Sequence, residues 1–206
     1  MSKEIKAILF DLGNVLIKLD FESVEKGYMA HGRIKEGSMI EHILNSDTMN
    51  RYMEGKIGSD AFYRKTTRHF RLDIGRTEFF RIWNSMFSAY PEMEDILKTL
   101  KEKYPHIKLI LISNTCESHY DFIKEQFSVL RLLDDHVVSH VFGAQKPDPS
   151  IYFEALKIAG ALPKDTFYAD DRPDLIDAAR RLGIHAFQFT THEELKGQLA
   201  KFNIKV

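Results

Sequence analysis

The stretch AILFDLGNVLI, Ala7 to Ile17, decides the fold of this chain. Four apolar residues typical of a short buried strand end at a single carboxylate, Asp11, and a Gly-Asn pair follows before the chain turns apolar again. A buried aspartate needs a partner or a chemical role, because desolvating an unpaired carboxylate is costly. Within this segment alone, capping of a loop is the simpler interpretation of Asp11, so the rest of the chain has to decide.

The bulk composition is that of a soluble globular protein. The 206 residues are 44% hydrophobic and 29% charged, enough for one large domain or one domain with an insert. A formal net charge of -1 gives no general attraction to nucleic acid or to anionic membranes, and no apolar run has the length of a membrane span. The N-terminus lacks a signal core, and the one cysteine, Cys116, fits a reducing compartment. We therefore expect a cytoplasmic protein without nucleic-acid or membrane partners.

From about Glu92 onward, helical and strand patterns alternate. Buried strands separated by amphipathic helices predict a Rossmann-like α/β fold, with a parallel sheet covered on both faces. The predicted helices span 92–104, 117–127, 148–160, 173–183 and 191–202, and the predicted strands after Ala7–Phe10 span 107–113, 136–142, 166–170 and 184–189.

The segment from Phe21 to Tyr90 differs from the rest of the chain. It has helical patterns, no convincing strand and many aromatic residues, which favours the packed core of a small helical bundle. Its position directly after the first strand predicts a lid over the carboxyl edge of the sheet, where ligands bind in open α/β folds. The predicted division is a core domain of residues 1–20 and 91–206 with a helical cap of residues 21–90.

Four polar clusters fall at the carboxyl ends of predicted strands: Asp11, Ser113 to Thr115, Lys146, and the pair Asp170 and Asp171. Each is weak alone, because turn residues, a solvated lysine and helix-capping acids explain them separately. A parallel sheet, however, brings all its strand ends to one rim. The order of the clusters therefore predicts carboxylates, an ammonium group and a hydroxyl around one crevice.

The same residues carry a resemblance to a known family. FDLGNVLI, LISNT, QKPDPSIY and YADDRPDLIDAA are similar, in order and spacing, to the four motifs of the haloacid dehalogenase superfamily, most of whose members are magnesium-dependent phosphatases. The match runs from Lys6 to about Phe189, and the segment 21–90 resembles the helical cap of one subclass. Within the superfamily, DLGNV resembles the branch that contains glucose-1-phosphate phosphatase and related sugar-phosphate hydrolases.

The resemblance implies a hydrolase that acts on a small phosphorylated metabolite. Asp11 would be the nucleophile that forms an aspartyl-phosphate, which agrees with the need to align a weak nucleophile in line with phosphorus. Mg²⁺ would be held by Asp11, the backbone carbonyl of Gly13 and Asp170. Asp171 or Asp174 would orient the waters on the metal.

The resemblance also assigns the phosphate contacts. Lys146 would neutralise the phosphoryl oxygens, and Ser113, with the backbone N–H of Asn114, would hold the remaining oxygen. Asp11, Ser113 and Lys146 are thus the expected catalytic residues, and Ser113, Asn114 and Lys146 the expected substrate-binding residues.

The chain departs from the family pattern at Gly13. Most phosphatases of the superfamily carry a second aspartate two positions after the nucleophile, as general acid and base, and Gly13 has no side chain to protonate a leaving oxygen. General acid catalysis contributes about 10²–10⁴-fold. Gly13 therefore predicts substrates with good leaving groups, anomeric sugar 1-phosphates above all.

Two alternatives stay open at this point. A 2-haloacid dehalogenase would also use Asp11 and would lack the second aspartate, but it has no use for the pair Asp170 and Asp171, and no matching tyrosine follows Asp11. A non-catalytic phosphate-binding protein would keep the fold without turnover. The sequence names no substrate, and it leaves open whether the chain is a monomer or a small homo-oligomer.

Overall fold

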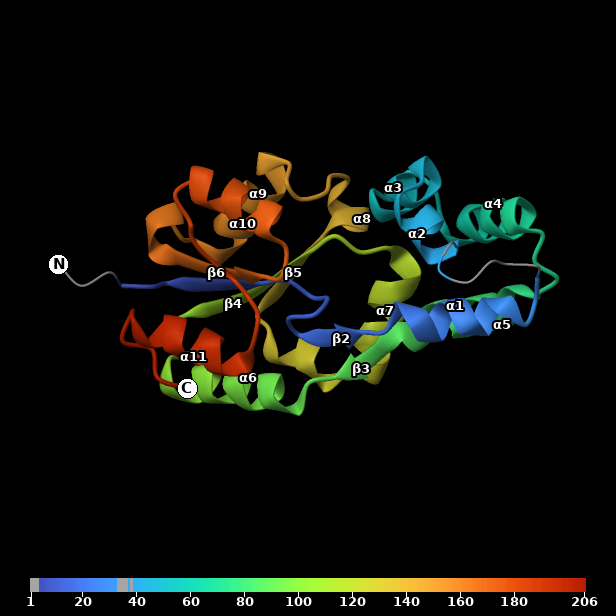
Figure 1. Cartoon of the computed structure of the whole chain (residues 1–206). Coiled ribbons are helices and arrows are strands. Elements are labelled where there is room, and N and C mark those ends of the chain that lie inside the picture. The colour runs from blue at the N-terminus through green and yellow to red at the C-terminus, as the bar shows by residue number, and fades with distance from the viewer. Residues whose placement is uncertain (1–3, 33–36, 38) are drawn as a thin grey trace.

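The computed structural model describes residues 4–32, 37 and 39–206, and a parallel sheet lies at its centre (Figure 1). The sheet has five strands in the order β5-β4-β1-β6-β7, so the first strand of the chain is the middle one. The Rossmann-like α/β prediction is confirmed. The strands are β1 (Ala7–Phe10), β4 (Lys108–Ser113), β5 (Asp135–Val138), β6 (Thr166–Asp170) and β7 (His185–Gln188).

Helices cover both faces of the sheet, which explains why its strands are apolar without alternation. Ile8 and Phe10 belong to a cluster with residues of α6 (Pro91–Lys103) and α11 (His192–Ala200). Leu9 faces the other way and packs with α9 (Pro149–Ala159) and α10 (Pro173–Arg181). Figure 1 shows these two helix pairs on opposite sides of the sheet.

The predicted strand 136–142 is wrong in its second half. β5 ends at Val138, and Ser139–Phe142 forms a short helix, α8, which Gly143 ends at a φ of 93°. The buried Ser139 hydroxyl lies 2.6 Å from the Met53 carbonyl oxygen and 3.0 Å from that of Thr115, at the point where the chain leaves the sheet. A run of so few residues shows too little periodicity to distinguish a strand from a short helix.

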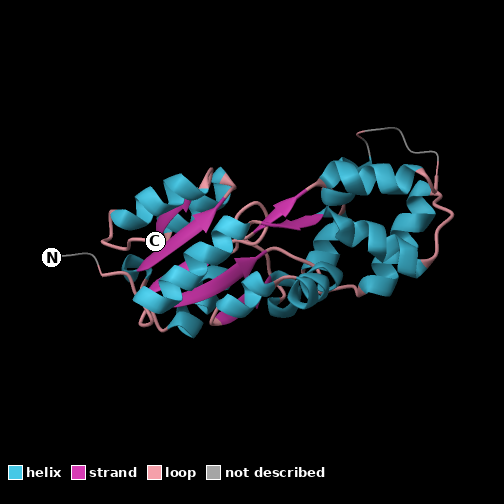
Figure 2. Cartoon of the chain, turned by 90° about the horizontal axis from the view of Figure 1, so that it is seen from below, coloured by secondary structure: helices cyan, strands magenta, loops and turns pink. Residues whose placement is uncertain are grey.

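The described residues between 21 and 86 form a helical group, and its buried side chains make a separate hydrophobic cluster that Cys116 joins from the core. Figure 2 shows this group at one end of the molecule, joined to the sheet by a pair of short strands. Its helices are α1 (Phe21–Met29), α2 (Met39–Leu44), α3 (Asp47–Met53), α4 (Ser59–Phe70), α5 (Arg76–Trp83) and the 3-10 turn η1 (Asn84–Met86).

The prediction that 21–90 holds no strand is wrong at its end. β3 (Phe87–Ala89) pairs antiparallel with β2 (Ile17–Leu19), with Leu19 opposite Phe87. Three-residue strands are too short to give a periodicity in sequence. The boundaries of the core and cap domains stay a prediction.

The remaining elements are α7 (Glu117–Gln126) and the 3-10 turns η2 (Ser128–Leu132) and η3 (Pro163–Asp165). None of the helices within 4–32 and 39–206 is long and apolar enough to cross a bilayer.

The end of α3 and the loop that follows it lie against the core at very short range. The Ser139 hydroxyl donates to the Met53 carbonyl at 2.6 Å, and the Ser118 N–H donates to the Tyr52 hydroxyl at 3.1 Å. Gly55 has a φ of 67°, and a Cβ there would lie 2.1 Å from the backbone oxygen of His140. Only glycine lets the two backbones approach this closely.

Replacing Gly55→Ala should therefore separate this loop from α8. We expect the free energy of unfolding to fall by about 1–3 kcal/mol more than in Gly160→Ala. Gly160 is the matched control, because its φ of 61° carries the same backbone strain while its Cβ would meet nothing within 4 Å. Chemical denaturation of both variants measures the difference, and equal losses would show that the close approach costs nothing.

Candidate active site

Asp11 lies at the centre of the sheet's carboxyl edge because β1 is the middle strand. Its N–H donates to the carbonyl of Ala169 at 2.9 Å, which continues the pairing of β1 with β6 by one residue. Phe10 is paired with Leu111 on the other side, so the end of β4 is equally near. Strand register alone thus brings Asp11 beside Asp170 and close to Ser113.

The Lys146 ammonium group lies between two of these carboxylates. Its Nζ is 2.6 Å from Asp11 Oδ1 and 2.7 Å from Asp170 Oδ2, and it also contacts the Ile112 carbonyl at 2.9 Å and the Tyr168 hydroxyl at 3.1 Å. The Lys146 side chain is 1% exposed and that of Asp170 is fully buried. Burial on its own would lower the pKa of Lys146, but the two carboxylates raise it above its ordinary value and keep the ammonium charged.

Asn114 fixes the backbone from which Lys146 extends. Its amide group donates to the Lys146 carbonyl at 2.8 Å and accepts from the Lys146 N–H at 2.7 Å. A reciprocal pair of this kind binds the end of β4 to the loop after α8, although the two are 32 residues apart. The Asn114 side chain therefore positions Lys146.

Three carboxylates converge beside this ion pair. One oxygen each from Asp11, Asp170 and Asp171 lies within 4.8 Å of the others. The Arg172 N–H donates to Asp170 at 2.9 Å, and the Asn14 amide donates to Asp171 at 3.0 Å, so both side chains are held in place. Clustered carboxylate oxygens are the ligands that Mg²⁺ prefers.

The charge balance of the cluster supports a cation there. Burial raises the pKa of the Asp11 carboxyl to about 7, in spite of Lys146, and the nearby Asp170 adds to the rise. One ammonium group thus leaves the carboxylates under-compensated. A divalent cation would supply the missing charge, so the residues present fit the predicted magnesium ion.

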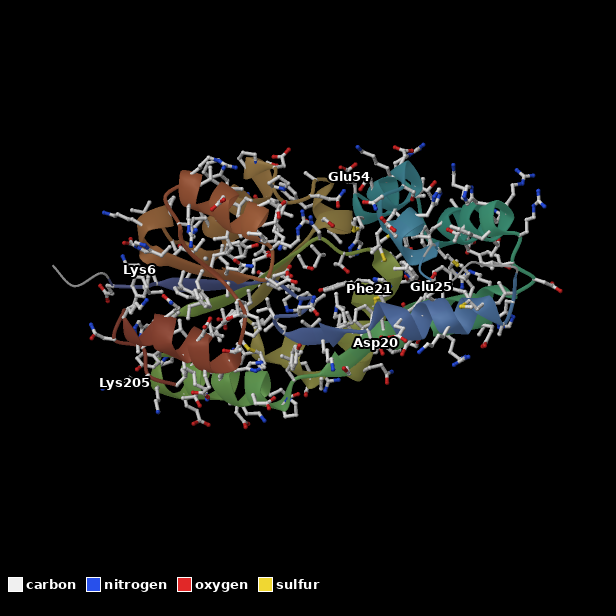
Figure 3. The ribbon with its side chains drawn as sticks, viewed as in Figure 1. Lys6, Asp20, Phe21, Glu25, Glu54 and Lys205 are labelled. Atoms are coloured by element: carbon white, nitrogen blue, oxygen red, sulfur yellow. The ribbon has the colours of Figure 1, made fainter. Side chains whose placement is uncertain are left out.

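A cavity of about 980 Å³ opens over these groups. Ser113, which is 2% exposed, lies at its floor with Asn114, Lys146 and the Asp11 carboxylate. Residues of α3 and of the segment 19–21 line the opposite side, and Figure 3 shows Phe21 and Glu54 at the core-facing ends of α1 and α3. The predicted phosphate contacts and the helical group therefore face one common space.

The remaining predicted residues take different places. Gly13 lines the cavity next to Asp11. Asp171 belongs to the carboxylate cluster, whereas Asp174 is more than half exposed and forms an ion pair with Arg172 at 2.6 Å. Of the two residues proposed to orient metal waters, the geometry favours Asp171.

Two residues of the site were missed in the sequence. Tyr168 contacts Lys146 and donates a short hydrogen bond to Asp170; it precedes Asp170 by two residues in a strand, so the alternation of strand faces was an available signal. His119 lines the cavity from α7, stacked on Trp83 with ring centroids 4.8 Å apart. Nothing in its local sequence distinguishes His119 from a surface histidine.

His119 should make the protein sensitive to acid. Burial lowers its pKa to about 3, and its Nε2 has no hydrogen-bond partner. The unfolded chain takes up a proton near pH 6.5 and the folded chain does not, so stability is complete above that pH and is lost as the pH falls toward about 3. We expect His119→Phe to remove a slope of up to about 1.4 kcal/mol per pH unit in this window.

Denaturant unfolding between pH 7.5 and 4 measures this slope, with His106→Phe as the control on the exposed His106. An unchanged slope in His119→Phe would show that His119 is protonated in the folded protein.

Comparison with known proteins agrees with this geometry. The sequence model of the haloacid dehalogenase-like hydrolases matches residues 5–183. The D-ribitol-5-phosphate phosphatase of Bacteroides thetaiotaomicron is 23% identical over 189 residues, covering 89% of this chain and 91% of that protein. The sesquiterpene phosphatase of Aspergillus oryzae is 24% identical over 193 residues, covering 92% of each.

A similar solved structure is that of a HAD family enzyme from Bacteroides thetaiotaomicron in complex with magnesium and inorganic phosphate. It superposes with a TM-score of 0.81 at 26% identity, covering 91% of this chain and 96% of that one. The predicted magnesium cofactor is confirmed by this similarity together with the carboxylate cluster. The predicted branch of sugar-phosphate hydrolases stays a prediction, whereas the family is shown: the chain is a hydrolase that belongs to the haloacid dehalogenase-like family.

Proposed function

We propose that this protein is a Mg²⁺-dependent phosphatase of a small phosphorylated metabolite and that it acts through an aspartyl-phosphate on Asp11. The observation that carries the proposal is the Lys146 ammonium group held between Asp11 and Asp170 at the floor of the cavity. The names of the similar proteins, two of them phosphatases, support it.

The chemistry divides between the residues as follows. An oxygen of Asp11 attacks phosphorus, the bond from phosphorus to the leaving oxygen breaks, and the leaving oxygen takes its proton from water. A water molecule then attacks phosphorus, and the bond to Asp11 breaks to release inorganic phosphate. Lys146 offsets the negative charge that would otherwise make Asp11 and the phosphoryl group repel each other. Asp11, Asp170 and the Gly13 carbonyl would hold Mg²⁺, which would supply further positive charge to the phosphoryl oxygens.

Ser113 and the backbone N–H of Asn114 are proposed to hold a phosphoryl oxygen. Their position at the end of β4, next to Asp11 across the sheet edge, supports this assignment. The Asn114 side chain is already paired with the Lys146 backbone, so its backbone rather than its amide group is the proposed contact.

Because Gly13 has no side chain that could protonate the leaving oxygen, the reaction depends on how readily that oxygen departs. A Cβ at residue 13 would lie 2.8 Å from Leu19 Cδ1, so the space in which the family's second aspartate would begin is occupied by an apolar side chain. We propose that the substrates carry a leaving oxygen that departs without a proton from residue 13. Anomeric sugar 1-phosphates and aryl phosphates share this property.

The domain division is part of the proposal. We propose that residues 1–20 and 91–206 carry the chemistry and that residues 21–90 are the cap, supported by the separate hydrophobic cluster of the helical group. We further propose that the protein is cytoplasmic and is a monomer or a small homo-oligomer.

Replacing Asp11→Asn should abolish turnover, because the amide is not a nucleophile and the metal loses a ligand. Lys146→Met should lower kcat/KM by at least about 10²-fold through lost charge stabilisation of the transition state. Phosphate release from aryl phosphates in Mg²⁺ and in EDTA measures both, with chloroacetate as a parallel substrate. Halide release that survives EDTA would favour the dehalogenase, and no release of either product would favour a binding protein.

Mg²⁺ should also stabilise the folded protein, independently of turnover. At a free concentration one hundred times its Kd, the gain is about 2.7 kcal/mol. We expect Tm to rise between EDTA and saturating Mg²⁺, and the rise to shrink in Asp170→Asn and Asp171→Asn but not in Asp174→Asn, whose carboxylate faces solvent. A Tm that does not respond to Mg²⁺ in the unsubstituted protein would contradict the metal site.

A further inference from the structure

The side of the cavity facing away from the phosphate contacts is lined by two kinds of residue in two different places. Among the described residues between 19 and 87, seven of the lining residues are apolar, and every one of these is buried or half-buried. The apolar wall consists of Leu19, Phe21, Leu44, Met49, Met53, Met86 and Phe87.

The polar lining residues of the same segment are mostly exposed to solvent. Five of the six are exposed, namely Asn45, Asp47, Asn50, Arg51 and Lys56, and the sixth, Glu54, is half-buried. Their charges cancel, with two acids against two bases, and the Lys56 ammonium pairs with Glu54 at 2.6 Å. Among the lining residues between 19 and 87, the acids and bases therefore balance, and the unbalanced charges of the cavity lie at its floor with Asp11, Lys146 and Asp171.

The apolar wall reaches the reacting centre. Leu19 covers the backbone of Gly13, two residues from the Asp11 nucleophile. Phe87 packs edge-on against the His119 ring at 4.8 Å, and His119 is itself held neutral by burial. An atom bonded to the leaving oxygen would thus meet hydrocarbon and aromatic surface.

Hydroxyl groups of a polyol placed against the apolar wall would lose their hydrogen bonds to water and gain none from the wall, which is costly. An apolar body gains free energy there instead, and three methionine side chains can adapt to its shape. From these contacts we infer that, among esters whose leaving oxygen departs readily, the enzyme prefers those of neutral, predominantly apolar alcohols such as aryl phosphates to those of sugars, and that their hydrocarbon binds against the apolar wall. The inference rests on the proposed phosphatase function and gives its substrate class.

The test separates apolar binding from leaving-group chemistry. The 4-methyl-, 4-propyl- and 4-pentylphenyl phosphates have phenols of nearly equal acidity and differ only in hydrocarbon. We expect kcat/KM to rise about two- to fourfold for each added CH₂ until the cavity is filled. Pentyl phosphate and ribitol 5-phosphate form a second pair of five-carbon primary esters, in which we expect the pentyl ester to have the higher kcat/KM.

A variant of the wall links the preference to this surface. Phe21→Gln should lower the ratio of kcat/KM for the pentylphenyl ester to that for the methylphenyl ester by about fivefold or more. Phe153→Gln is the matched control, because Phe153 is 53% exposed on α9 and does not line the cavity. Because the measure is a ratio within one variant, partial misfolding that lowers both activities does not change it.

Each outcome decides one question. A series that is flat in chain length, or a higher kcat/KM for ribitol 5-phosphate than for pentyl phosphate, would overturn the inference and leave the phosphatase function standing. A ratio unchanged by Phe21→Gln would also overturn the placement of the alcohol on this wall. Absence of phosphate release from every ester in saturating Mg²⁺ would instead overturn the proposed function itself.

Discussion

The placement of one ammonium group between two carboxylates is the constraint on which the site depends. Lys146 is almost fully buried, and a lysine in that position is tolerable only if its charge is compensated at short range. Asp11 and Asp170 provide that compensation from neighbouring strands, and the Tyr168 hydroxyl completes the contacts. The parallel sheet is what makes the arrangement possible, because it ends β1 and β6 at the same level.

The same interaction explains why the loop before α9 is so closely tied to β4. A long flexible side chain reaches a fixed point only if its backbone is fixed as well. The two hydrogen bonds between Asn114 and the Lys146 backbone provide this, and Ser139 holds the preceding helix through Thr115. The polar residues after β4 thus hold Lys146 in position, although Lys146 follows β5 and α8 in the chain.

The sequence predicted the sheet and the residues at its edge because both leave a local signal. β1, β4 and β6 are apolar runs that end in polar residues, and parallel pairing then brings Asp11, Ser113 and Asp170 together without further information. The end of β5 and the short β3 were misjudged, since Ser139–Phe142 and Phe87–Ala89 mix apolar and polar residues over too few positions to show a period, and contacts made elsewhere in the chain decide their structure.

The lining of the cavity could not be predicted for a related reason. Leu19, Phe21 and Phe87 have the composition of any hydrophobic core, and only the packing of the helical group shows that they face a space rather than one another. The cover of Leu19 over Gly13 likewise depends on the turn between them. Residue type was enough to predict the polar groups at the floor of the cavity, whereas the apolar wall depended on three-dimensional packing.

The pairing of β2 with β3 also separates two kinds of evolutionary change. The chain leaves the sheet at Leu19 and returns at Phe87, and these two residues are directly opposite in the ribbon. The helical group lies between these two residues, and it contacts the core again where Met53 meets Ser139 and Tyr52 meets Ser118. Insertions or deletions in the helical group that keep these contacts can therefore alter the apolar wall of the cavity without moving a strand or Asp11. Proteins built on this frame can thus differ in the residues that line the cavity while the residues at the carboxyl edge of the sheet stay the same.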